Sequence, residues 1–122
     1  MPDTCKYNEQ ELRQLLACDE TPVFVAVEQD EVCGYAFCQL TKSHGNGAFA
    51  EHKALYLDDL CVLETCRGTG IGKALYQYVL QFAKGQGCYH VTLNVWMCNP
   101  TAVKFYEKMG LTPQKITMEQ IL

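Results

Sequence analysis

The feature that most constrains this chain is a glycine-rich turn between a strand-like run and a helix-like run. Gly68, Gly70 and Gly72 fall within five positions of one another. The apolar run 55–63 precedes them, and a run with helical periodicity follows over 72–85. Glycine loses more backbone entropy on ordering than any other residue, so three glycines within five positions indicate a backbone that cannot carry side chains there. Because a helix N-terminus presents unpaired N–H groups, the stretch predicts a phosphate site. The alternative is that the glycines serve only the geometry of a tight connection.

Composition excludes several classes of protein. The 122 residues suit a single domain over 1–122, and a hydrophobic content of 48% can form one core. A net charge of −4 argues against a general nucleic-acid-binding surface, and no run approaches the ~20 apolar residues of a membrane span. The first residues lack the apolar centre of a signal peptide, which predicts a cytoplasmic protein. The eight cysteines include no C-x-x-C pair, so we expect no metal site and mostly buried free thiols.

Periodicity and turn signals predict an α/β chain in which the first strands of the sheet are antiparallel. A helix comes first, with Asn8 as its N-cap, and a hairpin follows around the turn 29–31. Asn99 and Pro100 open a later helix, and Gly110 ends it. In chain order, the expected elements are helix 8–17, strands 21–27, 32–40 and 55–63, helix 72–85, strand 90–96, helix 101–109, and one or two short strands in 112–122.

Two familiar phosphate loops do not fit the glycine turn. The P-loop pattern G-x-x-x-x-G-K-[ST] requires glycine where Arg67 stands and Ser or Thr where Ala74 stands. The dinucleotide pattern G-x-G-x-x-G fails because Gly72 comes one residue early. Any phosphate held here therefore belongs to a different type of loop, with Arg67 and Lys73 adding positive charge on its two sides.

A third pattern does fit. Residues 67–72 match [QR]-x-x-G-x-[GA] and resemble the pyrophosphate loop of the GNAT superfamily of N-acetyltransferases. The second signature of that superfamily, N-x-x-A-x-x-F-Y-x-x-x-G-[FL], is matched in register by Asn99, Ala102, Phe105, Tyr106 and Gly110. The resemblance covers 23–122. It implies an α/β chain with a mixed α+β sheet, the GNAT-like acyl-CoA N-acyltransferase fold, with the family's first strand and first helix missing.

Similarity to the family implies acetyl-CoA as co-substrate. It assigns the pyrophosphate to the backbone of 68–73, and the pantetheine arm to the backbone of 61–63, where the arm pairs like an extra strand between two splayed strands. The amide near Val62 is expected to polarise the acetyl carbonyl. The residues assigned to the cofactor are Cys61, Val62, Leu63, Arg67, Gly68, Thr69, Gly70, Ile71, Gly72, Lys73, Asn99, Ala102 and Tyr106.

The resemblance also assigns catalytic residues. Tyr106 matches the position that protonates the leaving thiolate, and simple helix packing is its alternative role. The run 57–62, LDDLCV, is similar to the spermidine/spermine and diamine acetyltransferases. In those enzymes the residue matching Asp58 takes the proton of the amine through water, and the one matching Asp59 lies near the substrate. Because strand neighbours point to opposite faces, only one aspartate is expected to face the acetyl site. The alternative is one aspartate solvated at a bulge and the other in a structural pair.

The expected function is acetyl-CoA-dependent N-acetylation of a primary amine by direct attack, with a small cationic amine favoured over a protein amine. A covalent mechanism through Cys61 is disfavoured, because no activating base lies near it in sequence. Glu28, His44 and His52 are weaker candidates for the base. The alternatives are a non-catalytic CoA-binding or regulatory domain and a phosphate-binding module without acyl transfer. The missing first strand leaves the hairpin edge open, and a homodimer covering it is one of three explanations, beside a truncated and a minimal chain.

Overall fold

A computed structural model describes residues 9–43, 52–66 and 68–122. Three helices and four strands follow one another in the order α, β, β, β, α, β, α. Asn8, His44 and Arg67, to which the sequence analysis gave roles, lie outside the described residues. The elements are α1 (Glu9–Leu16), β1 (Val23–Glu28), β2 (Glu31–Ser43), β3 (His52–Val62), a 3₁₀ turn (Glu64–Cys66), α2 (Ile71–Gly85), β4 (His90–Thr92) and α3 (Pro100–Lys108).

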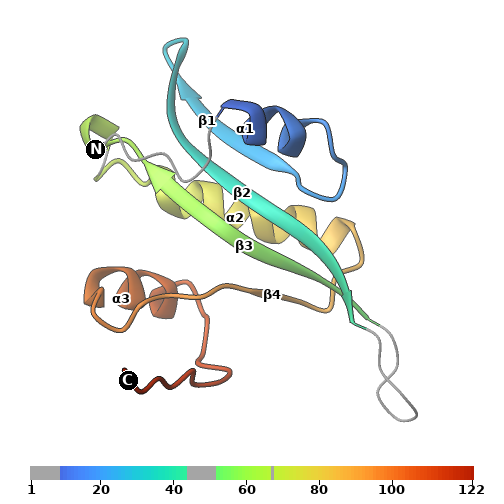
Figure 1. Ribbon diagram of the computed structural model, residues 1–122. Helices are drawn as coiled ribbons and strands as arrows, with labels where there is room; N and C mark the ends of the chain where they lie inside the picture. The colour runs from blue at the N-terminus through green and yellow to red at the C-terminus, as the bar shows by residue number, and fades with distance from the viewer. Residues whose placement is uncertain (1–8, 44–51, 67) are drawn as a thin grey trace.

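The strands form one mixed sheet in the order β1-β2-β3-β4. The first three strands are antiparallel, and β4 joins β3 in parallel. Figure 1 shows α2 crossing behind β2 and β3, and α3 following β4 at the lower side of the sheet. The mixed α+β architecture expected from the sequence is confirmed.

The β1–β2 hairpin closes through a two-residue turn. Gln29 and Asp30 both have positive φ, 50° and 65°, and Glu28 pairs with Glu31. Two consecutive left-handed residues define the turn type whose twist matches that of the flanking strands. The hairpin predicted around 29–31 is therefore confirmed, with a tighter turn than expected.

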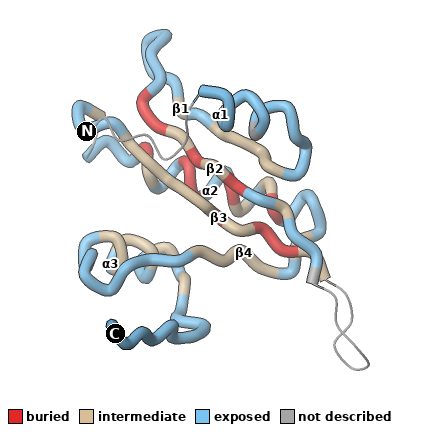
Figure 2. The backbone as a smooth tube through the Cα atoms, viewed as in Figure 1, coloured by how far each residue is buried: buried red, intermediate tan, exposed pale blue. Residues whose placement is uncertain are grey.

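The core lies between the sheet and α2. Tyr76 and Val79 of α2 pack on Leu55 of β3, and these three side chains are the largest that are fully buried. In Figure 2 the buried stretches lie on β2, on the first half of β3 and on the covered side of α2. The helical spacing of the apolar residues in 72–85 thus predicts the face that α2 buries.

Gly34 allows β2, β3 and α2 to approach closely. A Cβ at this position would lie 2.8 Å from the carbonyl oxygen of Cys61 and 3.1 Å from Cδ1 of Leu75. Real Cβ atoms do not approach backbone so closely, so only glycine fits without a shift of the strand. This contact fixes α2 against the end of β3 that carries the candidate site.

Two expectations about strands are wrong. The strand expected over 90–96 ends at Thr92, since the chain leaves β3 there and turns into α3 through a hydrogen bond from Asn99 N to Trp96 O, 3.0 Å. The tail 112–122 contains no strand. Its apolar side chains Ile116, Met118 and Ile121 are exposed, so no buried face holds the tail in a register.

The cysteines are less buried than predicted. Cys33 and Cys38 are buried, whereas Cys18 and Cys98 are exposed; Cys61, Cys66 and Cys88 are intermediate. All seven cysteines in the described part of the chain are free thiols. None of the helices among the described residues has the length and apolar character needed to cross a membrane.

Candidate active site

The sheet opens between β3 and β4. The two strands pair only over Ala54–Tyr56 and His90–Thr92. Beyond that point β3 continues to Val62 with β2 on its other side. The segment that follows β4 diverges from β3 as it approaches α3 (Figure 1). Over 57–62 the edge of β3 that faces away from β2 makes no backbone pairs with β4, as in the splayed arrangement that the family resemblance implies; we call the region beside this edge the gap.

The direction of the backbone at the end of β3 follows from one hydrogen bond. The N–H of Leu63 donates to the carbonyl oxygen of Cys33, 2.8 Å, so it points toward β2. Backbone groups of successive strand residues point to opposite sides, so the N–H of Val62 is directed toward the gap. Of the three residues assigned to the pantetheine arm, Val62 has the orientation required of a donor into the gap, and Leu63 does not.

The glycine turn leads from β3 to the start of α2. Gly68 and Gly70 have φ of +84° and +82°, and a Cβ at either would meet nothing within 4 Å. Their conformation, rather than a lack of space, therefore requires glycine. Gly70 is the N-cap of α2 and supplies no side-chain hydrogen bond to the first turn. Thr69 donates its hydroxyl hydrogen to the carbonyl oxygen of Cys66 and so braces the turn. The arrangement leaves the N-terminus of α2 without a side-chain cap, as an anion site requires.

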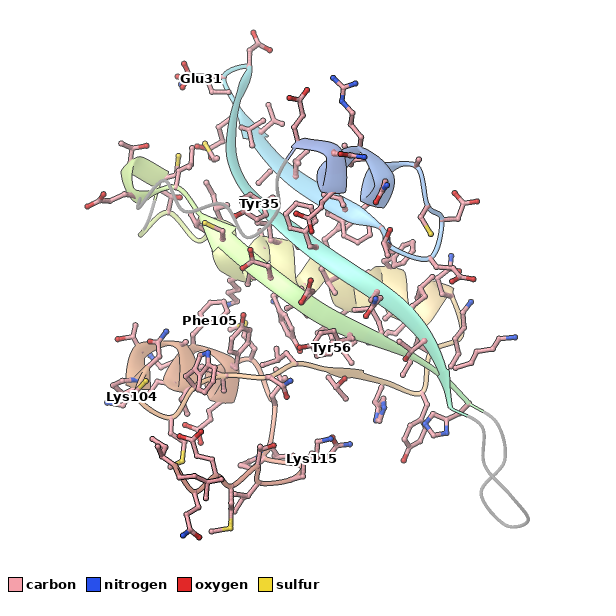
Figure 3. All side chains as sticks on the ribbon, viewed as in Figure 1. Glu31, Tyr35, Tyr56, Lys104, Phe105 and Lys115 are labelled. Carbon is pink, nitrogen blue, oxygen red and sulfur yellow. The ribbon has the colours of Figure 1, made fainter. Side chains whose placement is uncertain are left out.

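Gly72 lies where the turn meets β3 and α3. A Cβ there would lie 3.5 Å from Val62 and 3.6 Å from Phe105, both ordinary contact distances. Figure 3 shows Phe105 rising from α3 toward the sheet. The N-terminus of α2, the end of β3 and α3 thus meet at one end of the gap.

The N-cap predicted at Asn99 is confirmed. Its side-chain oxygen accepts a hydrogen bond from the N–H of Ala102, 3.2 Å, and Pro100 occupies the first turn. Gly110, with φ of +102°, ends the helix as expected. These local signals fix both ends of α3 and hence the position of Tyr106 along it.

Tyr106 lies where α3 meets α2 and β3. Its ring makes an edge contact with Tyr76, with centroids 6.0 Å apart. Burial raises its pKa to about 12, and the negative charge of Asp59 and the phenol of Tyr76 act in the same direction. A phenol with this pKa is protonated at neutral pH and can act as a proton donor. The packing role and the acid role that the sequence left open are therefore compatible.

Asp58 and Asp59 sit at a β-bulge. In the β2–β3 register Phe37 pairs with Asp59 and Cys38 pairs with Leu57, so Asp58 is the extra residue. The core-facing residues of β3 change phase across the bulge, from Leu55 and Leu57 before it to Leu60 and Val62 after it. Asp59, opposite Phe37, falls outside the set that faces α2. Burial raises the pKa of Cys38 to about 12, and the charge of Asp58 acts in the same direction, so Asp58 lies within electrostatic reach of a core residue. Simple alternation does not hold through a bulge, and the orientation of the two aspartates stays a prediction.

Sequence reasoning missed Tyr35, which the fold brings to Asp59. The hydroxyl group of Tyr35 donates to Oδ2 of Asp59 across 3.5 Å. Burial raises the pKa of Tyr35, and its hydrogen bond to Cys61 and the charge of Asp59 act in the same direction. The partners are 24 residues apart in the chain, and the hairpin pattern predicted that the strands would pair but not their bulged register.

The weaker base candidates lie away from the gap. Glu28 pairs with Glu31 at the hairpin turn. His52 is at the opposite end of β3, with its ring 5.5 Å from that of His90. Cys61 lies beside Tyr35, in keeping with a packing role rather than a nucleophilic one. In the described ranges no group of three or more His, Cys, Asp or Glu side chains could hold a metal ion.

Comparison with known proteins identifies the family. The sequence model of the Acetyltransferase (GNAT) family matches residues 2–111, so the chain belongs to this family. It is 38% identical over 103 residues to the peptidyl-lysine N-acetyltransferase YjaB of Salmonella typhimurium strain LT2, covering 82% of this chain and 58% of that protein. It is 32% identical over 63 residues to glucosamine 6-phosphate N-acetyltransferase 1 of Oryza sativa subsp. japonica, covering 52% and 36%. The chain thus spans less than two thirds of either relative.

Solved structures confirm the fold. The tetramutant of the BH1408 protein from Bacillus halodurans superposes with a TM-score of 0.89 at 29% identity, covering 96% of this chain and 76% of that one. An aminoglycoside N-acetyltransferase solved in complex with CoA superposes with a TM-score of 0.77 at 19% identity, covering 90% and 72%. The GNAT fold expected from the two sequence signatures is confirmed.

Proposed function

We propose that residues 1–122 form a single acetyltransferase domain that transfers the acetyl group of acetyl-CoA to a primary amine, and that a small cationic amine is the preferred acceptor. The observation that carries the proposal is the gap between β3 and β4. The amide-rich start of α2 meets the end of β3 there at Gly72 and Val62, and the protonated phenol of Tyr106 on α3 lies within electrostatic reach of Asp59. Membership of the GNAT family supports the reaction class.

The residues around the gap fit acetyl-CoA. The uncapped start of α2 suits the pyrophosphate, with Gly68, Thr69, Gly70, Ile71, Gly72 and Lys73 supplying amides and charge. The edge of β3 suits the pantetheine arm, whose amides can pair with the backbone of Val62 as a further strand would, while Cys61 and Leu63 direct their backbone groups at β2. Leu63 contributes apolar contact, since its N–H is directed at β2. The family resemblance also implies cofactor contacts for Arg67, Asn99 and Ala102.

The chemistry needs one proton acceptor, one donor and one oxyanion donor. The amine attacks the thioester carbonyl, a C–N bond forms and the C–S bond breaks, which leaves an amide and a thiolate. Asp58 takes the proton of the amine through a water molecule, and Tyr106 gives a proton to the thiolate. The N–H near Val62 stabilises the developing oxyanion. The raised pKa of Tyr106, about 12, keeps its proton available throughout the neutral range.

The choice of a cationic acceptor rests on the negative charge of the two aspartates. Two carboxylates at one bulge favour a cation over a neutral or anionic acceptor. Similar proteins are named for different acceptors, among them peptidyl-lysine and glucosamine 6-phosphate. A protein amine is the competing acceptor. A domain that binds CoA without catalysis is the competing function.

The proposal is tested by binding and by turnover. Calorimetric titration with acetyl-CoA is expected to show saturable binding, and its absence at millimolar concentration would overturn the cofactor assignment. Thiol release is then followed across a panel of diamines, polyamines, amino sugars and lysine peptides. Turnover fastest with small cationic amines supports the acceptor class, whereas faster turnover with peptides contradicts it. Binding without any turnover favours the non-catalytic alternative.

Tyr106→Phe separates the acid role from packing. The variant keeps the ring but loses the proton, so kcat is expected to fall by about 100-fold or more while acetyl-CoA still binds. Tyr78→Phe is the matched control, since Tyr78 lies on α2 and is 59% exposed. Full activity of Tyr106→Phe would contradict the acid role.

A further inference from the structure

Two cysteines from distant parts of the chain meet beside the start of α2. Cys33 of β2 belongs to a small apolar cluster with Ile71 and Leu75 of α2, and Cys66 packs against the same cluster from the end of the 3₁₀ turn. Both are free thiols, and Cys33 is buried whereas Cys66 is partly exposed. The cluster adjoins the glycine turn, because Ile71 is the first residue of α2.

A β-bulge brings Cys33 to this position. The register of β1 with β2 skips Cys33, since Val32 and Gly34 pair with consecutive residues of β1. Regular alternation would place Cys33 and Gly34 on opposite faces of the sheet, but both lie against α2. The bulge therefore turns the thiol of Cys33 toward the start of α2.

The turn after β3 brings Cys66 to the same place. The N–H of Leu63 donates to the carbonyl oxygen of Cys33, 2.8 Å, and the N–H of Cys66 donates to the carbonyl oxygen of Leu63, 2.9 Å. The two cysteine side chains share a hydrogen bond as well. This hydrogen bond is the first of the effects that raise the pKa of Cys33 to about 11, before burial and the charges of Cys66 and Glu28. Backbone and side-chain contacts thus hold the two sulfur atoms next to each other.

Cys61, on the last turn of chain before this region, points away from the pair. Leu60 and Val62 pack toward α2, so the side chain of Cys61 between them is directed to the opposite face. There it shares a hydrogen bond with Tyr35. Cys61 is therefore a thiol close in sequence to Cys66 that does not share its partner.

We propose that Cys33 and Cys66 are a site of reversible oxidation, at which a low-molecular-weight disulfide such as oxidised glutathione converts the two thiols into one disulfide bond. The more exposed Cys66 reacts first: its thiolate attacks one sulfur of the glutathione disulfide, a mixed disulfide forms and one glutathione thiolate leaves. The thiolate of Cys33 then attacks Sγ of Cys66, the bond between the two cysteines forms and the second glutathione thiolate leaves. Two protein thiols are oxidised and one glutathione disulfide is reduced, and the two protons that the cysteines lose are taken up by the two glutathione thiolates.

The disulfide bond is expected to act on the glycine turn. Thr69 of that turn donates its hydroxyl hydrogen to the carbonyl oxygen of Cys66, so the two move together. A disulfide bond is much shorter than a hydrogen bond between two thiols, and its formation draws Cys66 toward β2. The effect on acetyl-CoA rests on the proposed function, in which the turn holds the pyrophosphate, whereas the formation of the bond does not.

The bond is tested by mass spectrometry without reference to activity. The folded protein is equilibrated with oxidised glutathione, free thiols are blocked with iodoacetamide, and the tryptic peptides are fragmented to locate any disulfide. A bond between Cys33 and Cys66 is expected in the wild type and in Cys61→Ala, the matched control. Cys33→Ala is expected to accumulate the mixed disulfide on Cys66 instead. A wild-type protein that carries only the glutathione adduct, a bond to Cys61 or no disulfide overturns the proposal, and this result needs no variant to fold.

The effect on the turn is tested by calorimetric titration with acetyl-CoA. The oxidised protein is expected to bind about 10-fold more weakly than the protein reduced with dithiothreitol, because the anion site is displaced, and reduction is expected to restore the affinity. Cys66→Ala can form neither the bond nor the adduct at this position, so it is expected to bind equally after both treatments. Equal affinities of the oxidised and reduced wild type, or the same loss in Cys66→Ala, overturn the effect on the turn. A wild-type protein that binds no acetyl-CoA in either state refutes the proposed function alone, since the peptide map still decides whether the bond forms.

Discussion

At the residue scale, Asn99 shows how one side chain can serve both the fold and the site. Its oxygen accepts from the N–H of Ala102 and so starts α3, the helix that carries Tyr106. Asn99→Ala is expected to lower the free energy of unfolding by about 1 kcal/mol, measured by urea denaturation. Asn99→Asp is the control, because it keeps the accepting oxygen and suits the helix dipole. Equal losses in the two variants would show that the cap does not explain the effect.

At the scale of elements, the contact of α2 with β2 and β3 depends on Gly34. Gly34→Ala places a Cβ 2.8 Å from the carbonyl oxygen of Cys61, so it is expected to lower the free energy of unfolding by about 1–3 kcal/mol. Gly85→Ala is the matched control, because Gly85 ends α2 with open space around its Cα and gains helix propensity. We expect Gly85→Ala to be neutral or stabilising by up to ~1 kcal/mol in the same urea experiment. A Gly34→Ala variant as stable as the wild type would contradict the close approach.

At the scale of the whole molecule, β1 is an edge strand, and no other strand among residues 9–43, 52–66 and 68–122 pairs with its outer side. Val25 and Val27 are each 56% exposed, and a groove of about 410 Å³ lies between β1 and α2, lined by Val23–Ala26, Ala74, Leu75 and Tyr78. Native proteins protect exposed edge strands, and we propose that a second copy of the chain covers this one. Sedimentation velocity is expected to show a dimer that Val25→Lys converts to monomer. Ile116→Lys, on the exposed tail, is expected to leave the dimer intact. A wild-type monomer at all concentrations would contradict the proposal.

Much of the fold was predictable because its signals are local. The cap of α3, the positive φ of Gly110 and the apolar face of α2 are each set by residues close together in sequence. The two GNAT signatures lie on these same segments, so the fold class followed from them.

The details of the site depend on partners distant in sequence. The bulge at Asp58 arises because β3 has one residue more than β2 at that point, and no local pattern marks it. The same misalignment brings Tyr35 to Asp59, so this contact could not be predicted from alternation. β4 is short because its partner strand turns away from it after Tyr56, although its own residues favour a longer strand.

β4 is attached to β3 through only three residue pairs, and this affects how readily this part of the fold unfolds locally. β4 and α3 are joined to the sheet by few backbone bonds, so their amides are expected to exchange with solvent through local opening, well below the free energy of global unfolding. A ligand that pairs with β3 binds only when this segment is in place, and it suppresses the opening in proportion to its concentration. The segment that contains β4 and α3 is thus expected to open less often as the concentration of a ligand that pairs with β3 rises.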